Sequence, residues 1–173
     1  WGSTITEADV ALLKKLALEE GISGKEESVY VLPTPMSPYR CIITVGLGNH
    51  RDFDAEVLRR AAGQVCSALK SHKIDHLVLD ASVNDALPVE AFVEGIILGT
   101  YDFRFYKTFG DTKQVTLKEL SIVVGSEDAL EPLREGCART AIVCNNVNWA
   151  RHLANTPAND LTPTALAEEA EGF

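Results

Sequence analysis

Short apolar runs alternate with amphipathic stretches along this chain of 173 residues, and this alternation limits the possible folds more than any other feature. Residues 29–32, 41–45, 76–80 and 117–124 have the length and composition of strands, while the stretches between several of them repeat apolar residues at helical spacing. Strands that are apolar almost throughout are typical of a sheet covered on both faces. The sequence therefore predicts an α/β domain of three layers, α/β/α, with a mixed central sheet.

Helix boundaries are marked by capping residues in the first half of the chain. Thr4 and Glu7 have the spacing of a capping box, and Gly21 supplies a stop, so the chain is expected to open with a helix. A second helix is expected to follow Asp54 and to end near His72. Both predictions rest on local signals only.

The second half of the chain has three further helix starts. Pro88 is expected to open one helix, and Ser126 is expected to cap another that reaches about Leu153. Thr162 followed by Pro163 is typical of a helix with Pro at its first position.

The strongest interruption of the chain lies between Asn155 and Pro163, where Pro157 and Pro163 prevent helical pairing. The last helix then reaches Phe173 with too little chain to form a core of its own. We expect residues 1–154 to form one domain and residues 155–173 to be a linker and the start of a helix that leads to a further domain.

Composition excludes several classes of partner. A net charge of −9 and a pI near 4.9 repel phosphate backbones and anionic lipids, so nucleic acid and membrane surfaces are not expected partners. No apolar run approaches the roughly 20 residues that cross a bilayer. No secretory signal is visible, although the chain starts at Trp1 and not at Met. The four scattered cysteines indicate free thiols and a cytoplasmic location.

Three sequence motifs, in this order, resemble those of leucyl aminopeptidases. The first motif is a Gly-Leu-Gly loop after a strand. The second is the segment Glu-Gly-Ile-Ile-Leu-Gly-Thr-Tyr-Asp-Phe at 94–103. The third is the junction Asn-Thr-Pro-Ala-Asn-Asp-Leu-Thr-Pro at 155–163, which follows an Arg-bearing helix. The matching residues are Gly46, Gly48, Glu94, Gly95, Gly99, Tyr101, Arg151, Asn155, Thr156, Pro157, Asn159, Thr162 and Pro163.

This resemblance implies a non-catalytic, macro-domain-like N-terminal domain that contributes to assembly of a hexamer. Its expected partners are its own catalytic domain and sister subunits, and the parent enzyme is expected to release residues such as leucine from peptides by two-metal catalysis. The two divalent ions, zinc or manganese, would be bound in the catalytic domain. No Asn-Thr-Asp-Ala-Glu-Gly-Arg motif occurs here, so no catalytic, metal or cofactor residue is expected in this chain, which alone should be inactive.

The glycines of the second motif have an expected packing role. Gly95 and Gly99 are four residues apart on a helix and would permit close approach of a neighbouring element. Tyr101, Phe103 and Tyr106 would pack the end of that helix.

An alternative reading concerns the Gly46-Leu47-Gly48 loop. Glycines after a strand can bring backbone N–H groups close to a phosphate, so a stand-alone module that binds a nucleotide or ADP-ribose is a second hypothesis. Position 51 is Arg where a dinucleotide fingerprint needs Gly, so a tight turn is favoured.

Two groups of ionisable residues are candidate sites. His72 and His76 are separated by a helix-to-strand turn, which argues against a shared metal. Asp80, Asp85 and Glu90 follow a strand end, but their spacing is irregular, and capping of the next helix by Asp85 explains more.

Structural roles are also favoured for the remaining candidates. Cys137 and Cys144 lie on one helical face and are expected to be buried as small apolar residues. Arg151 and His152 could touch a substrate or partner, but Arg near a helix C-terminus is more often a cap for carbonyl groups. His50 has no motif-linked partner for nucleophilic catalysis.

Overall fold

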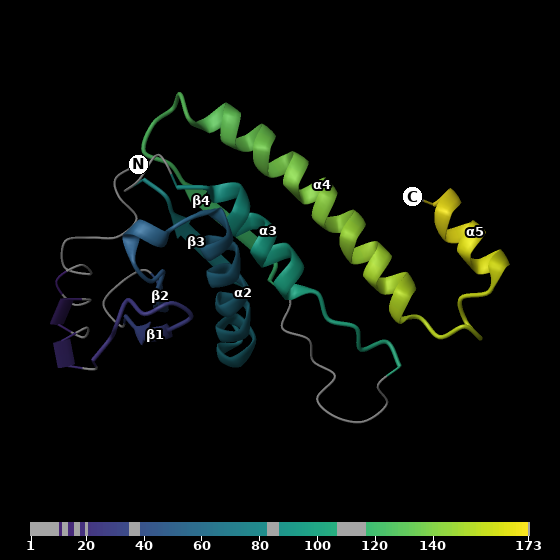
Figure 1. The fold of residues 1–173 in the computed structure, drawn as a ribbon, viewed down its shortest axis with the longest axis horizontal. Helices are drawn as coiled ribbons and strands as arrows, with labels where there is room; N and C mark the ends of the chain where they lie inside the picture. The colour runs from purple at the N-terminus through teal and green to yellow at the C-terminus, as the bar shows by residue number, and fades with distance from the viewer. Residues whose placement is uncertain are drawn as a thin grey trace.

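The computed structural model describes residues 11, 14–15, 18–19, 21–34, 39–82, 87–106 and 117–172. Elements are labelled as in Figure 1. The strands are β1 (Val29–Pro33), β2 (Cys41–Val45), β3 (His76–Asp80) and β4 (Glu119–Val123). The helices are the short 3-10 helix η1 (His50–Asp52) and the α-helices α2 (Ala55–His72), α3 (Val89–Thr100), α4 (Leu130–Asn155) and α5 (Pro163–Glu171).

The strands pair in both directions. β1 and β2 are antiparallel with Val29 opposite Val45, and β3 and β4 are parallel with His76 opposite Glu119. The α/β class is confirmed. The described strands form two sheets of two strands, where the sequence led us to expect one mixed sheet. Apolar runs identify strands but do not specify which distant segment each one hydrogen-bonds to.

Both sheets nevertheless share one core. Leu77 and Leu79 of β3 and Ile43 and Val45 of β2 pack against buried residues of α2 and α3. The central buried residues are Leu58, Ala62, Val65, Cys66, Leu69, Phe92 and Ile96. Val78, on the opposite side of β3, is 37% exposed. The α2–α3 pair therefore covers one face of β3.

Helices α2 and α3 pack closely because α3 presents glycines to α2. A Cβ atom at Gly95 would lie 2.6 Å from the Cβ of Ala62 and closer still to the carbonyl oxygen of Arg59. A Cβ at Gly99 would lie 2.9 Å from the Cys66 Sγ. These are distances that real Cβ atoms do not reach, so the two backbones can approach only where α3 has no side chain.

Several predicted helix ends agree with the structure. Asp54 caps α2, since its Oδ1 accepts a hydrogen bond of 2.9 Å from the Val57 N–H. Gly21 has a φ of +64°, as a helix stop requires. The expected capping box of Thr4 and Glu7 lies outside the described residues.

One predicted helix start was wrong. α4 begins at Leu130, not after Ser126, and its N-cap residue is Ala129. A start at Ser126 would put Pro132 in the helix interior, which costs about 3 kcal/mol, whereas the observed start leaves it in the first turn. α3 begins at Val89, directly after Pro88, as expected, and Asp85 lies outside the described part of the chain.

A polar contact joins the starts of β3 and β4. The Lys118 Nζ donates to the Asp75 Oδ2 at 2.7 Å, and the Lys118 backbone N–H donates to the Asp75 carbonyl, also at 2.7 Å. Lys118, and secondly His76, lower the pKa of the Asp75 carboxyl group to about 2. The parallel pair is thus fastened at the end where both strands begin.

We expect Gly95→Ala to lower the free energy of unfolding by about 1–3 kcal/mol, because the new methyl group would force α3 away from α2. The matched control is Gly63→Ala in α2, where a Cβ would meet nothing within 4 Å. That change should raise stability by about 0.5–1 kcal/mol. Urea unfolding curves of the two variants would measure both effects; destabilisation of equal size would contradict the close-packing explanation.

The Asp75 contact predicts a pH dependence. Its folded pKa lies below the ordinary value of 3.8, so its contribution to stability is present above about pH 4 and is lost as the pH falls towards 2. Asp75→Asn should lower stability at pH 7 and flatten the decline between pH 4 and 2. The exposed Glu135→Gln variant of α4 serves as the control, and urea midpoints across this range would show whether the two profiles differ.

Candidate functional site

The C-terminal end of α3 is held by polar side chains from α4. The Arg151 Nη1 donates to the Leu98 carbonyl oxygen at 3.0 Å, and the Asn148 Nδ2 donates to the Ile97 carbonyl oxygen at 3.1 Å. The last four carbonyl groups of a helix have no partner within the helix and form its negative end. Arg151 therefore supplies a hydrogen-bond donor and a positive charge to the C-terminal carbonyl groups of α3.

Arg151 thus caps a different helix from the one that its sequence position indicated. We expected it to cap carbonyl groups near the end of its own helix, and in the structure it binds the end of α3. The end of α4 is closed instead by Thr156, whose backbone N–H and Oγ1 both donate to the His152 carbonyl oxygen, at 3.0 and 2.8 Å.

Tyr101 links the same two helices immediately after α3. The guanidinium carbon of Arg151 lies 4.1 Å from the centre of the Tyr101 ring, a cation–π arrangement. The Asn155 Nδ2 donates to the Tyr101 hydroxyl oxygen at 3.2 Å. Two residues of the third motif therefore contact one residue of the second motif.

Aromatic residues extend this contact towards the connection after α4. The ring of Phe103 lies 5.3 Å from that of His152 and 5.8 Å from that of Tyr106, measured between ring centres. A hydrogen bond to the Asp160 carboxylate raises the pKa of Tyr106. The segment after α3 and the segment after α4 are therefore tied together.

The connection from α4 to α5 is an ordered turn. The backbone N–H groups of Asp160 and Leu161 both donate to the Pro157 carbonyl oxygen at 2.9 Å. The Thr162 Oγ1 accepts from the Ala165 N–H at 3.2 Å, and Pro163 occupies the first turn of α5. Asn159 lies within the turn, with its Nδ2 3.5 Å from the Asp160 Oδ1.

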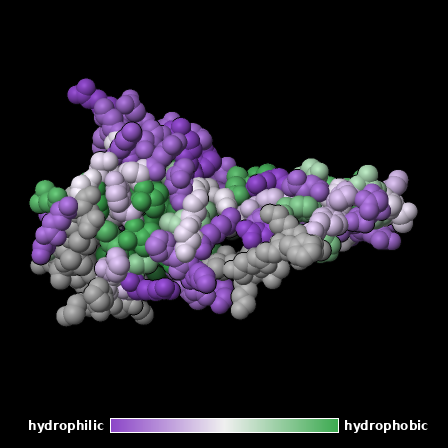
Figure 2. Space-filling view, turned by 90° about the horizontal axis from the view of Figure 1, so that it is seen from below, coloured by the Kyte–Doolittle hydropathy of each residue, from purple (hydrophilic) through white to green (hydrophobic). Residues whose placement is uncertain are grey.

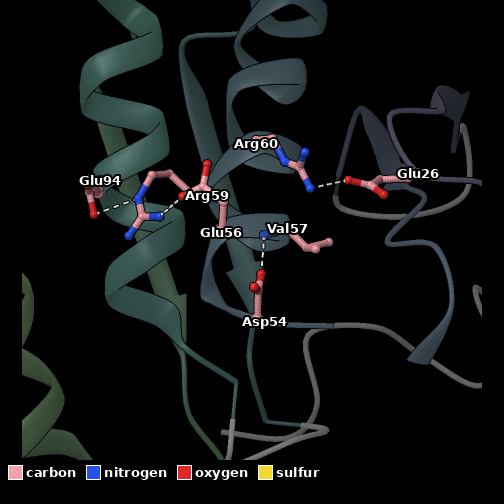
Figure 3. Close-up of polar contacts among 7 residues, drawn as sticks. All are labelled: Glu26, Asp54, Glu56, Val57, Arg59, Arg60 and Glu94. Atoms are coloured by element: carbon pink, nitrogen blue, oxygen red, sulfur yellow. Dashed lines mark hydrogen bonds and ion pairs between the residues drawn. The ribbon is translucent and has the colours of Figure 1, made fainter. Parts of the chain in front are cut away.

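Glu94, the first residue of the second motif, joins α3 to α2 (Figure 3). Its Oε2 lies 2.8 Å from the Arg59 Nε, and Arg59 also pairs with Glu56. The hydrogen bond to Glu94 is the main cause of the raised pKa of Arg59. This ion pair lies on the same side of α3 as Gly95, so it holds the helices at the close distance that the glycine permits.

The Gly46-Leu47-Gly48 loop is a closed turn. The Gly46 N–H donates to the Ser28 carbonyl oxygen at 2.8 Å, and the Gly48 N–H donates to the Gly24 carbonyl oxygen at 2.9 Å. Gly48 has a φ of +74°, and a Cβ on Gly46 would lie 2.8 Å from the Lys25 carbonyl carbon. Both glycine amides are used within the protein and are not free to bind a phosphate.

The ionisable groups weighed as sites do not converge in the described part of the chain. His72 ends α2 and His76 begins β3, separated by Lys73 in the left-handed region with a φ of +53°. The Asp80 Oδ1 accepts two hydrogen bonds from Ser82. No group of three His, Cys, Asp or Glu residues that could hold a metal occurs among the described residues.

The cysteines are free thiols; of the two expected to be buried on α4, Cys144 is buried and Cys137 is half-buried. Burial raises the pKa of the Cys66 thiol to about 11 and is also the main cause of the raised pKa of Cys137 and Cys144. His50 opens the 3-10 helix η1. In the described helices, no segment is long and apolar enough to span a bilayer.

Sequence reasoning missed four residues of this arrangement: Asn148, Asp160, Arg59 and Lys70, whose Nζ donates to the Gly99 carbonyl oxygen at 3.4 Å. One signal was available, since Asn148 is three residues before Arg151 and must lie on the same face of α4. The other three act between segments whose proximity the sequence does not state.

A comparison with known protein families shows which family the chain belongs to. A family model described as the N-terminal domain of the cytosol aminopeptidase family matches residues 3–109. The chain belongs to the cytosol aminopeptidase family. The matched range contains the glycine loop and α3 and stops before α4.

Cytosol aminopeptidase relatives extend the similarity beyond that range. A probable cytosol aminopeptidase of Geotalea uraniireducens is 34% identical over 136 residues, which are 76% of this chain and 27% of that protein. One of Streptomyces avermitilis is 36% identical over 163 residues, which are 87% of this chain and 31% of that protein. The chain therefore spans about a third, or less, of these relatives.

Solved structures support the fold of this cytosol aminopeptidase domain. A tomato leucine aminopeptidase mutant superposes with a TM-score of 0.74 at 25% identity, covering 94% of this chain and 32% of that one. The bottromycin maturation enzyme BotP, solved in complex with Mn, gives a TM-score of 0.72 at 24% identity, covering 91% of this chain and 32% of that one.

We expect Arg151→Ala to lower the free energy of unfolding by about 1–2 kcal/mol, because it removes a charged hydrogen bond and a cation–π contact. It should also speed hydrogen exchange of residues 156–162. The control is Arg134→Ala near the start of α4, where the exposed ion pair with Glu131 at 3.5 Å should contribute less than about 0.5 kcal/mol. Equal losses in the two variants would contradict the assigned role of Arg151.

Proposed function

We propose that this chain is the non-catalytic N-terminal domain of a leucyl aminopeptidase, and that it positions the segment leading to the catalytic domain. The observation that carries the proposal is the set of contacts among Arg151, Asn155 and Tyr101. These contacts hold the ends of α3 and α4 together at the point where the chain leaves the domain. The residues involved are those of the two motifs shared with leucyl aminopeptidases.

The enzyme reaction itself would take place outside this chain. The parent protein would hydrolyse N-terminal residues such as leucine from peptides, and two divalent ions, zinc or manganese, would polarise the scissile carbonyl and activate water. The described residues do not fit such a centre, because no three potential ligands come together. In this proposal the metal ions are bound in the catalytic domain.

The proposed domain boundary lies at the end of α4. Residues 1–154 would form the accessory domain and residues 155–173 the linker and first helix towards the catalytic domain. Support comes from α5, which makes no contact with another helix or strand among the described elements and projects from the body (Figure 1). A helix of nine residues with no packing partner gains little stability alone.

We further propose that the parent enzyme is a cytoplasmic homohexamer, with sister subunits as partners. The names of the curated relatives, cytosol aminopeptidases, and the free thiols support the cytoplasmic location. No observation favours the alternative of a nucleotide or ADP-ribose module, since the amides of Gly46 and Gly48 already have acceptors.

The proposal predicts where activity resides. Residues 1–173 alone, shown to be folded by circular dichroism, should give background hydrolysis of leucine amide with added zinc or manganese. The full-length protein should hydrolyse it, and a chelator should abolish the activity. Chelator-sensitive turnover by residues 1–173 would refute a non-catalytic role, and an inactive, metal-loaded full-length protein would refute the aminopeptidase assignment.

A further inference from the structure

Helix α4 has an unusual distribution of charge for a helix at the surface. Residues 140–150 contain no Asp, Glu, Lys or Arg, although 24% of the whole chain is charged. A helix that faces water normally carries charged residues on its outer side, whereas a helix that is apolar on several sides is normally covered on several sides. The outer side of α4 over these residues therefore lacks charged side chains, as the buried centre of a protein–protein interface typically does.

Among the residues that the structure describes, those packed against α4 cover one of its sides. Cys144 is 2% exposed and Asn148 reaches the end of α3, so this side is turned to the body of the domain. Ile142, Val143 and Val147 are 65%, 57% and 42% exposed. Together with the exposed Ala150 they form a surface that we call the α4 apolar face.

The α4 apolar face lies close to the exit of the chain. Hydrophobic residues appear among the hydrophilic ones on the surface of the narrow part of the molecule that α4 and α5 form (Figure 2). Leu166 of α5, beyond the ordered turn at 156–162, is 44% exposed and adds a further apolar side chain. The α4 apolar face and Leu166 therefore both lie in the narrow part of the molecule that ends with α5.

The lengths of the relatives identify an occupant. This chain corresponds to 27% and 31% of two curated relatives, and the matching family model is an N-terminal domain. Most of the polypeptide in those proteins therefore lies after this region. A following domain on the same chain is present at a high effective concentration, so even a modest apolar surface suffices to bind it.

We propose that the α4 apolar face is the docking surface for the domain that follows α5 on the same polypeptide. That domain would present an uncharged, apolar patch to Ile142, Val143 and Val147. This inference rests on the proposed function, since it takes the following domain to be the catalytic one. The contacts of Arg151 set the direction in which the chain continues after α4. The α4 apolar face then fixes the orientation of the two domains relative to each other.

The test uses the full-length protein with Val143→Cys, and with Arg134→Cys as the control near the start of α4, where the native side chain is 77% exposed. Maleimide labelling at each introduced thiol is followed by mass spectrometry. Labelling at position 143 should be about tenfold slower than at position 134. The thiol at position 143 would react only while the interface is open, which would be the case in fewer than a tenth of the molecules. Equal rates would overturn the proposal.

A second measurement identifies what covers the surface. Isotopically light and heavy full-length Val143→Cys proteins are mixed, allowed to exchange subunits, and cross-linked from the introduced thiol. Cross-links that join light to light and heavy to heavy, and that reach peptides beyond residue 172, support docking within one chain. Light-to-heavy cross-links in mixed assemblies would instead identify a sister subunit and overturn the proposal.

Leucine amide hydrolysis by the same samples separates the two proposals. An active enzyme with rapid labelling at position 143 would refute the docking surface and leave the proposed function standing. Slow labelling and same-chain cross-links in a protein that hydrolyses no aminopeptidase substrate would support the interface and refute the catalytic assignment.

Discussion

The close contact between α2 and α3 is the constraint on which the rest of the domain depends. Gly95 leaves room for the backbone of α2, and the partly buried pair of Glu94 and Arg59 holds the helices at that distance. The side chains around this contact form the core against which both sheets pack. A side chain at Gly95 would separate the helices and would also disturb the surface that receives the strands.

Because α2 holds α3 in place on one side, the C-terminal end of α3 provides a fixed position to which α4 can bind. The C-terminal carbonyl groups of α3 receive Lys70 from α2 and Arg151 from α4. Two cations at the negative end of one helix are favourable for the helix dipole, and they also connect three helices at one point. The position of the exit from the domain is thereby defined relative to the core.

Local signals allowed much of the fold to be predicted. The strand at 76–80, the cap at Asp54 and the Thr-Pro start of α5 are encoded within a few residues and agree with the structure. The start of α4 differs from the prediction because a helix that begins after Ser126 would have Pro132 in its interior. Strand pairing, and the capping of α3 by a residue 53 positions away, depend on tertiary contacts that no local pattern contains.

The separation in sequence between Arg151 and Leu98 also sets an order of formation. The contacts of Cys66 with α3 close a loop of about 30 residues, whereas the Arg151 contact with Leu98 spans 53. Longer closures cost more entropy and can form only after both ends exist. During synthesis the chain would thus complete its α2–α3 core first and form the α3–α4 contact last. The direction of the catalytic domain that we propose to follow α5 would then be set only as that domain begins to be made.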